Sequence, residues 1–258
     1  MPNTAKIKGR MKTITSTQKI TKAMKLVSLS KLQQYKRRMA SFDVYFDALQ
    51  KNNEKFIGFS QSDQDLASVY LIFMPNLGLC SSYTNGMNRF VHENLKEDDV
   101  AILVGTQHYD LLQKQGINIL NPMISSEKFE IEDALEYLKD MQETHHICAL
   151  LPDYQGLNLV FEKVQLHTKA VQLRDDVIFE PNFKEASQRL ISVSVIAMVQ
   201  NTYFQSKVAE HTTRRIAMEK ATDSAQDMLD ELLRLYNKAR QEAITQEIAE
   251  IVSGMEAN

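Results

Sequence analysis

Two long stretches of the sequence repeat apolar residues every three or four positions and contain no glycine or proline. The first runs from Arg10 to Ile57 and the second from Asn182 to Ser253, which are 48 and 72 residues. As α-helices they would be roughly 70 Å and 110 Å long at ~1.5 Å per residue, too long to fit inside a globular domain. Their apolar positions form a narrow seam, which is typical of a coiled coil. We therefore predict two long helices that pair with each other.

The seam and the ends of the second helix can be assigned to individual residues. Glu185 follows Asn182 by three positions, so the pair is placed to cap the start of the helix as in a capping box. Gly254 is placed to end it. The predicted seam positions are Ile14, Leu32 and Tyr35 in the first helix and Met218, Ala225, Leu232 and Leu235 in the second.

Between the two helices the pattern changes to short apolar runs. The runs at 69–74, 100–105, 117–120 and 147–151 predict buried strands of a parallel sheet, and 158–167 and 177–180 predict more exposed strands. Helical patterns alternate with them at about 85–96, 107–115 and 130–143. This alternation predicts a small Rossmann-like α/β domain. The expected fold class is α/β, with an N-terminal coiled-coil helix at 1–57, an α/β domain at 58–181 and a C-terminal coiled-coil helix at 182–258. Because the domain is inserted between them, the helices should pair antiparallel.

Charge is distributed unevenly along the chain. Residues 1–42 carry eleven Lys or Arg and no Asp or Glu, whereas residues 43–200 carry twelve basic and twenty-three acidic residues. A basic segment on an acidic body indicates an acidic partner, which could be nucleic acid, anionic lipid or an acidic protein surface.

The residues around these cations favour a protein partner. Residues 1–34 contain one arginine and no aromatic residue, which is unfavourable for nucleic-acid binding. The segment 17–25, TQKITKAMK, offers only Ile20 and Met24 as large apolar residues, too few for a helix that lies on a membrane surface. We therefore expect an acidic protein surface.

Sequence signals of compartment are few. No run of eighteen apolar residues predicts a membrane span, and the first residues, MPNTAKIKGRMK, lack the apolar segment of a signal peptide. The two cysteines, Cys80 and Cys148, are far apart and outside any C-x-x-C motif. We expect a reducing, cytosolic environment and no disulfide framework.

Motifs for catalysis or cofactor binding are missing from the sequence. It contains no P-loop, no G-x-G-x-x-G and no G-x-S-x-G motif. Cys80 is the best candidate nucleophile, since it follows a predicted strand where a helix N-terminus could lower its pKa, but a small buried residue is the favoured interpretation. His145 and His146 would point to opposite faces of a strand, so with Cys148 they make a poor metal site. The acidic run at 97–99 predicts a solvated loop. We expect no catalytic residue, metal or cofactor on this chain.

Two segments resemble a known family. Residues 7–39, IKGRMKTITSTQKITKAMKLVSLSKLQQYKRRM, resemble the N-terminal helix of the γ subunit of F-type ATP synthases, and residues 209–254 resemble its C-terminal helix. The resemblance implies a non-catalytic rotor shaft, whose coiled coil projects into a ring of α and β subunits that bind Mg-ATP and Mg-ADP. It also implies that the α/β domain meets a small ε/δ-type foot subunit and a proton-translocating membrane ring. As part of this complex, the chain would lie peripherally on the cytoplasmic side of the membrane, without a membrane span of its own and without bound nucleic acid.

The resemblance also implies contact residues. Lys22, Met24 and Lys25 would face the acidic lever segment of the β subunits. The end of the second helix, from Glu247 to Gly254, would run in an apolar bearing. Arg240, Gln241 and Thr245 would meet the loops that catch the shaft, and Gln246 and Glu247 would also contact the ring of α and β subunits. Exposed charge pairs contribute only about 0–1 kcal/mol each, which suits contacts that form and break at every step.

The domain departs from the family pattern. After the first strand the family usually has SDRGLCG, where this chain has MPNLGLCSS at 74–82, and the C-terminal SGA is SGM here. These changes leave open a specialised F1-like ATPase paralogue whose shaft drives a different mechanical or membrane assembly. A stand-alone α/β enzyme or nucleic-acid binder on a coiled-coil stalk is the remote alternative.

Overall fold

A computed structural model describes residues 2–59, 66–141, 144–156, 158–166, 170–172 and 178–256. The chain forms two compact units. One, the helix-pair unit, comprises Met1–Leu29 and Arg214–Asn258, and the other, the sheet unit, comprises Ser30–Thr213. Helix α1 (Pro2–Phe56) and helix α5 (Phe183–Glu256) each run without a break through both units. The boundary between the two units therefore falls inside each helix, between residues 29 and 30 of α1 and between residues 213 and 214 of α5.

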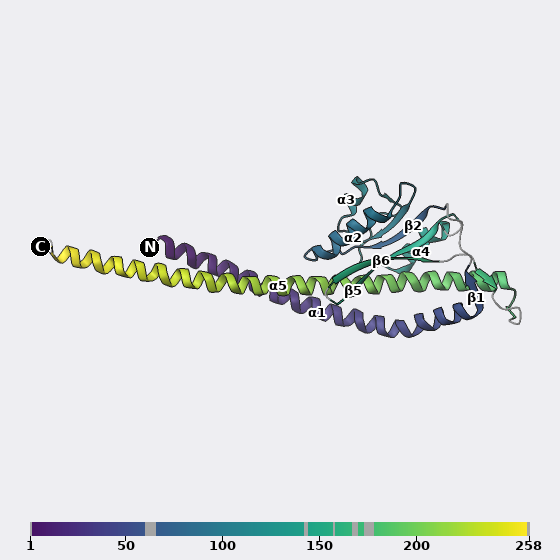
Figure 1. Ribbon diagram of the computed structural model, residues 1–258, viewed down its shortest axis with the longest axis horizontal. Helices are drawn as coiled ribbons and strands as arrows, with labels where there is room; N and C mark the ends of the chain where they lie inside the picture. The colour runs from purple at the N-terminus through teal and green to yellow at the C-terminus, as the bar shows by residue number, and fades with distance from the viewer. Residues whose placement is uncertain are drawn as a thin grey trace. The chain divides into compact units, whose positions relative to one another are not determined.

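In the helix-pair unit, α1 and α5 run antiparallel (Figure 1). Thr21 Oγ1 lies 2.7 Å from Thr222 Oγ1, and Gln18 Nε2 donates to the side chain of Gln226 at 3.0 Å. As residue numbers rise along α1 they fall along α5, which is the predicted antiparallel arrangement. Both threonines are buried, so the seam contains polar as well as apolar positions.

The seam on α5 follows steps of three and four residues from Met218 to Ala239. Met218, Ala225 and Leu232 are buried, and Tyr236 and Ala239 are half-buried. On α1, Ile14 is half-buried, and Leu32 and Tyr35 are buried in the sheet unit. Leu235 is 46% exposed, so its assignment to the seam is wrong. It lies one position before the seam residue Tyr236, because the step after Leu232 is four residues rather than three.

The sheet unit contains a five-stranded sheet in the order β4-β3-β2-β5-β6. Strands β4, β3, β2 and β5 are parallel, and β6 is an antiparallel edge strand that pairs with β5. The predicted mixed α/β architecture is thus confirmed. The strands are β2 (Ser68–Phe73), β3 (Val100–Val104), β4 (Asn118–Ile119), β5 (His146–Gln155) and β6 (Asn158–Leu166).

The sheet unit departs from the prediction in two places. Strands β1 (Ile57–Phe59) and β7 (Ala170–Gln172) form a separate antiparallel pair. The predicted strand at 177–180 is wrong for its described part, since 178–180 form no strand, and residue 177 lies outside the described residues.

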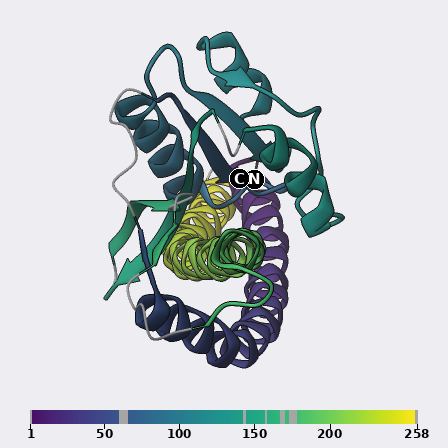
Figure 2. The same cartoon turned by 90° about the vertical axis from the view of Figure 1, so that its right-hand side faces the viewer.

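Helices cover both faces of the five-stranded sheet. α2 (Ser81–Asn94) and α3 (Tyr109–Lys114) pack on one face, and α4 (Ile131–Met141) and α5 pack on the other (Figures 1 and 2). Side chains alternate between the faces as a pleated strand requires. In β2, Tyr70 belongs to the core beneath α2, whereas Val69 belongs to the core that contains Val195 and Val199 of α5. The N-terminal part of α5, which belongs to the sheet unit, thus contributes to the core of that unit.

The ends of α5 follow the prediction at one end only. The backbone N–H of Glu185 donates to Asn182 Oδ1 at 3.0 Å, which confirms the cap, and the Asn182 amide donates to Glu185 Oε1 at 3.2 Å. At the other end, α5 continues through Gly254 to Glu256, so the prediction that Gly254 ends the helix is wrong. Gly254 keeps a helical backbone rather than the left-handed one of a capping glycine.

Candidate partner-binding site

The first predicted contact group lies on α1 in the helix-pair unit. Lys22 is exposed, and Met24 and Lys25 are half-buried. Lys25 Nζ donates to Glu219 Oε1 at 2.6 Å, and Arg215 Nη1 lies 3.2 Å from the other carboxylate oxygen. The hydrogen bond from Lys25, together with its charge, lowers the pKa of Glu219. Lys25 therefore has a counter-charge on α5, which the acid-free segment around it did not indicate.

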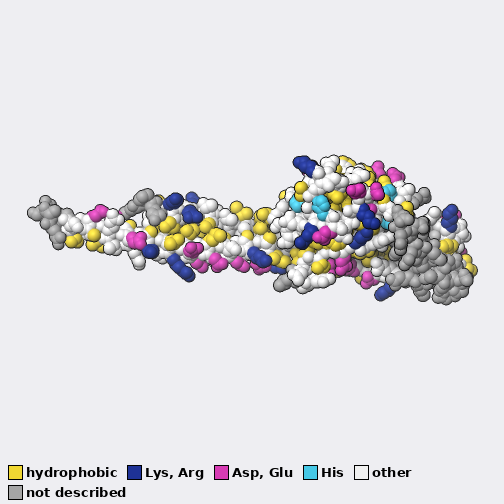
Figure 3. Space-filling view, turned by 45° about the horizontal axis from the view of Figure 1, so that its top comes forward, with side chains coloured by type: hydrophobic (Ala, Val, Ile, Leu, Met, Phe, Trp, Pro, Cys, Tyr) yellow, Lys and Arg dark blue, Asp and Glu magenta, His cyan; other side chains and the backbone are white. Residues whose placement is uncertain are grey.

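Pairing with α5 leaves the helix-pair unit positively charged. The unit carries thirteen Lys or Arg against nine Asp or Glu, and the acidic residues all lie on α5. Figure 3 shows basic side chains beside hydrophobic ones along this part of the molecule. A net positive surface remains available to an acidic partner.

The second predicted contact group lies further along α5. Arg240, Gln241, Thr245, Gln246 and Glu247 are all exposed. The eighteen residues from Thr222 to Arg240 span about 27 Å of helix. Since Thr222 faces Thr21, the two groups form separate surfaces at different levels of the helix pair.

The end of α5 has no α1 segment beside it. Facing residues have numbers that add up to 243 or 244, so Pro2, where α1 begins, lies opposite residue 241 or 242 of α5. The remaining stretch to Glu256 extends past α1 by about 20 Å (Figure 1). Exposed apolar side chains are concentrated there, which marks a surface for another molecule. They are Ile244, Ile248, Ile251, Val252 and Met255.

The candidate nucleophile Cys80 and the candidate metal ligand Cys148 are both buried. Cys80 is fully buried, with its Sγ 3.5 Å from the Leu77 carbonyl oxygen. Cys148 is also buried, and burial raises the pKa of its thiol. Among the described residues, no group of three or more His, Cys, Asp or Glu side chains could hold a metal ion. In the same ranges no helix carries an apolar stretch sufficient to cross a membrane.

Asp99 corrects the prediction that the acidic run at 97–99 is a solvated loop. Residues 97 and 98 are exposed, but Asp99 is only 6% exposed. Its carboxylate accepts hydrogen bonds from the backbone N–H of Ser68 at 2.7 Å and of Lys96 at 2.8 Å. Asp99 thereby ties the loop before β3 to the start of β2.

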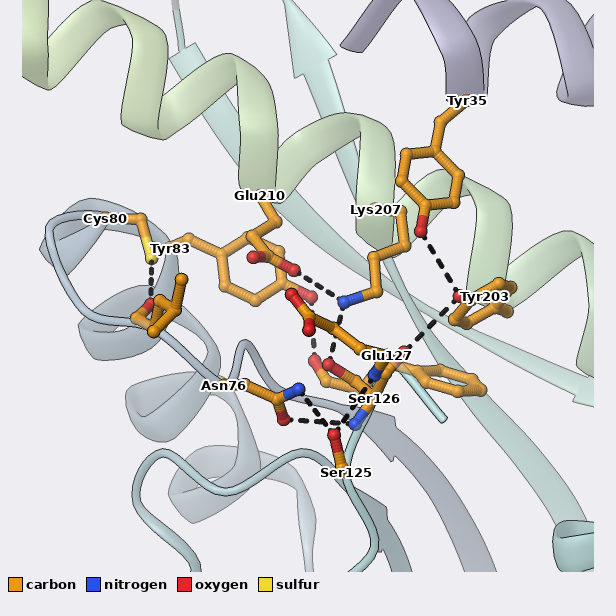
Figure 4. A network of polar contacts seen from close by, with 12 residues as sticks. Tyr35, Asn76, Cys80, Tyr83, Ser125, Ser126, Glu127, Tyr203, Lys207 and Glu210 are labelled. Carbon is orange, nitrogen blue, oxygen red and sulfur yellow. Dashed lines mark hydrogen bonds and ion pairs between the residues drawn. The ribbon is translucent and has the colours of Figure 1, made fainter. Parts of the chain in front are cut away.

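A buried polar network between α5 and the sheet was not predicted (Figure 4). Lys207 Nζ donates to Ser126 Oγ at 2.7 Å and to Glu210 Oε2 at 3.0 Å. Tyr203 OH donates to the Ser126 carbonyl oxygen at 3.3 Å and lies 3.4 Å from Tyr35 OH of α1. Spacing was the available signal, since Lys207 continues the four-residue steps that pass through the buried Val199 and the half-buried Tyr203.

Comparison with known proteins gives the family. A sequence model of the ATP synthase family matches residues 3–257. The ATP synthase gamma chain of Clostridium kluyveri is 31% identical, covering 97% of this chain and 96% of its own length. That of Mycoplasma mycoides is 29% identical, covering 100% and 99%.

Solved structures share the fold. A chain of the Euglena gracilis mitochondrial ATP synthase, in the structure of its OSCP, F1 and c-ring, superposes with a TM-score of 0.74 at 19% identity, covering 99% of this chain and 94% of that one. A chain from the rotor of the same enzyme gives 0.68 at 18% identity, covering 94% and 99%. With a family match over nearly the whole chain and a gamma chain at 31% identity, this protein belongs to the ATP synthase gamma-chain family.

Proposed function

We propose that this chain is the central-stalk rotor subunit of an F1 or F1-like ATPase. It has no active site of its own and transmits torque between ATP chemistry on α and β subunits and a load at the membrane. The observation that carries the proposal is the antiparallel helix pair, whose two helices continue without a break into the sheet unit. A twist applied to the helix pair must then pass through α1 and α5 into the α/β domain.

The surface of the helix pair suits contacts that change during rotation. Tight apolar packing at one angle would hold a shaft at that angle, whereas exposed ion pairs contribute only about 0–1 kcal/mol each. Lys22 is exposed on a unit with excess positive charge, and lysine side chains adapt to changing partner geometry. Lys22, Met24 and Lys25 are therefore the proposed contacts with an acidic segment of the β subunits, which carry Mg-ATP or Mg-ADP.

The end of α5 supports a second contact with the same ring. Its exposed isoleucines would run in an apolar bearing formed by α and β subunits. Arg240, Gln241 and Thr245 lie just before or within this stretch and would meet the loops that catch the shaft. Gln246 and Glu247 lie within it and would also contact the ring.

The default load is a proton-translocating membrane ring, reached with a small ε/δ-type foot subunit, on the cytoplasmic side of the membrane. One observation favours the alternative of a specialised paralogue with a different load. In the loop between β2 and α2, Leu77 and Leu79 are 62% and 54% exposed, and Asn76 and Leu77 stand where the family resemblance predicts a charged pair. An apolar loop at this place would fit a different foot partner.

Affinity purification through a tag on the sheet unit tests the proposal. Recovery of α and β subunits, with ATP-driven rotation of a bead attached to the sheet unit, is the expected result. Foot and ring subunits in the same complex would identify the default load, and other membrane proteins in their place would identify the specialised assembly. A chain that is purified without α and β subunits would refute the rotor function.

Met24→Lys tests the contact group on α1. A new cation beside the acidic segment should strengthen contacts that must break, so ion transport per ATP hydrolysed should fall more than hydrolysis itself. Met24→Leu keeps an apolar side chain of similar volume and should leave both unchanged. If Met24→Lys changed neither rate, Met24 would not face the β subunits.

A further inference from the structure

We infer that the buried contact between Lys207 of α5 and Ser126 of the loop after β4 is the joint that carries torque between the shaft helix and the α/β domain. The inference rests on the proposed rotor function and names the residues through which one step of it acts. Lys207 and Ser126 are positioning residues, since they would act on nucleotide chemistry only through the motion of the shaft.

The joint is fully buried on both sides. Lys207 is 4% exposed and Ser126 is 1% exposed. Lysine is almost never buried to this extent unless it is paired, and here Glu210 and the Ser126 hydroxyl are both within hydrogen-bond distance of its Nζ. The ammonium group is therefore held by directional bonds on two sides.

Ser126 in turn is anchored to two other loops of the sheet. Its backbone N–H donates to Asn76 Oδ1 at 3.0 Å, and Asn76 lies in the loop between β2 and α2. Thr106 and Gln107, after β3, donate to the Asn76 carbonyl oxygen, each at 3.2 Å. The loops at the carboxyl ends of β2, β3 and β4 thus meet at one place, and α5 is bound to that place (Figure 4).

The position of this joint in the sheet is informative. The strand order reverses at β2, whose neighbours are β3 on one side and β5 on the other. In open α/β sheets, ligands usually bind outside the carboxyl ends of the strands at such a reversal. Here, the loops at this edge bind α5 of the same chain, so the shaft helix occupies a place where other proteins commonly bind a ligand.

Directional bonds add to the apolar contacts around them. Val195 and Val199 bury α5 against the sheet by hydrophobic contact, which is non-directional, whereas the bonds from Lys207 and Tyr203 to Ser126 have a fixed geometry. A buried ion pair, for its part, often contributes little net stability compared with apolar residues of the same volume. Its contribution here is geometric, because it fixes the rotation of α5 relative to the loops of the sheet.

Torsional stiffness in the assembled complex tests the inference. The ring of α and β subunits is fixed to a surface, and a bead is attached through a cysteine introduced at the exposed Lys114 of α3. The angular variance of the bead is measured while the motor is paused, and ATP-driven rotation is measured in the same molecules. Both native cysteines are buried, so the introduced thiol reacts selectively.

Two variants weaken the joint. Among the described residues, two hydrogen bonds join α5 to Ser126, and Ser126→Ala removes the one from Lys207, so the variance should rise above that of wild type. Lys207→Met keeps the length of the side chain, removes the donor and should widen the variance at least as much. Ser192→Ala, at an exposed serine of the same helix, should leave it unchanged.

A third variant, which lowers the stability of the domain without touching the joint, distinguishes loss of torque transmission from general destabilisation. Val91→Ala removes buried volume on α2, on the opposite face of the sheet, and should lower the unfolding temperature without widening the variance. Equal widening in Val91→Ala, or unchanged variance in both joint variants, would overturn the inference while leaving the rotor function intact. Failure of the wild-type bead to rotate would refute the rotor function, and the inference with it.

Discussion

Replacement of Asp99 by asparagine gives the sharpest test of the fold, because the sequence and the structure predict different results. An acidic residue in a solvated loop can be neutralised with a change in unfolding free energy within about 0.5 kcal/mol. In the structure, the buried carboxylate accepts two backbone N–H groups, from Ser68 and Lys96. Hydrogen bonds to a charged group are worth about 1.5–3 kcal/mol each.

Asp99→Asn keeps one acceptor oxygen and places an amide NH₂ against the other N–H donor. One charge-assisted bond is lost and the remaining one is weakened, so we expect a loss of about 2–3 kcal/mol in unfolding free energy. At about 2–4 °C per kcal/mol for a unit of this size, the melting temperature should fall by about 4–12 °C.

Urea unfolding followed by tyrosine fluorescence measures the effect in the full chain. Eight of the nine tyrosines lie in Ser30–Thr213, so the signal reports mainly on the sheet unit. Asp98→Asn removes the same charge from the exposed neighbouring residue and is the matched control. If Asp99→Asn and Asp98→Asn unfolded at the same urea concentration, the two buried hydrogen bonds would not contribute as argued.

Three further predictions concern other parts of the molecule. Gly105 has φ +124°, and a Cβ there would overlap the main-chain carbonyl of Met74, so Gly105→Ala should cost about 3 kcal/mol or more in the same urea assay; a midpoint equal to that of wild type would contradict this. Leu232→Asp should place a charge in the buried seam and prevent recovery of complex with α and β subunits, whereas Leu233→Asp, at a 48% exposed position, should assemble; equal recovery of both variants would count against the seam. The pKa of Glu219 is lowered by its hydrogen bond and ion pair with a lysine of α1, so this pair stabilises the helix pair above the ordinary glutamate range and its contribution is lost as pH falls through the lowered pKa. The difference in stability between wild type and Glu219→Gln should therefore shrink on acidification and in high salt, and a difference that stays constant with pH would exclude this role.

The spacing of neighbouring residues was sufficient to predict most of the helices and strands and the buried face of each. The three- and four-residue spacing predicted both long helices, and short apolar runs located β2, β3, β4, β5 and β6. Asn182 and Glu185 predicted the start of α5, because a cap involves only residues three apart. Errors appeared where spacing leaves more than one option, as at Leu235, or where pairing depends on a distant segment, as for β1 and β7.

The buried polar residues required the tertiary structure. Nothing near Asp99 in the sequence distinguishes it from Asp98, since its partner Ser68 is 31 residues away. Lys207 likewise reads as a surface lysine until Ser126, 81 residues away, is seen beside it.

The residue pattern was enough to predict that two long helices flank an α/β domain, because helix and strand periodicity is a property of neighbouring residues. Which of the basic side chains have a partner within the chain became visible only in the tertiary structure. Lys25 binds Glu219 and Lys207 binds Ser126, whereas Lys22 remains at the surface. The reason is physical, since the cost of a charge depends on its burial and its partners, and both are set by segments that meet only when the chain folds.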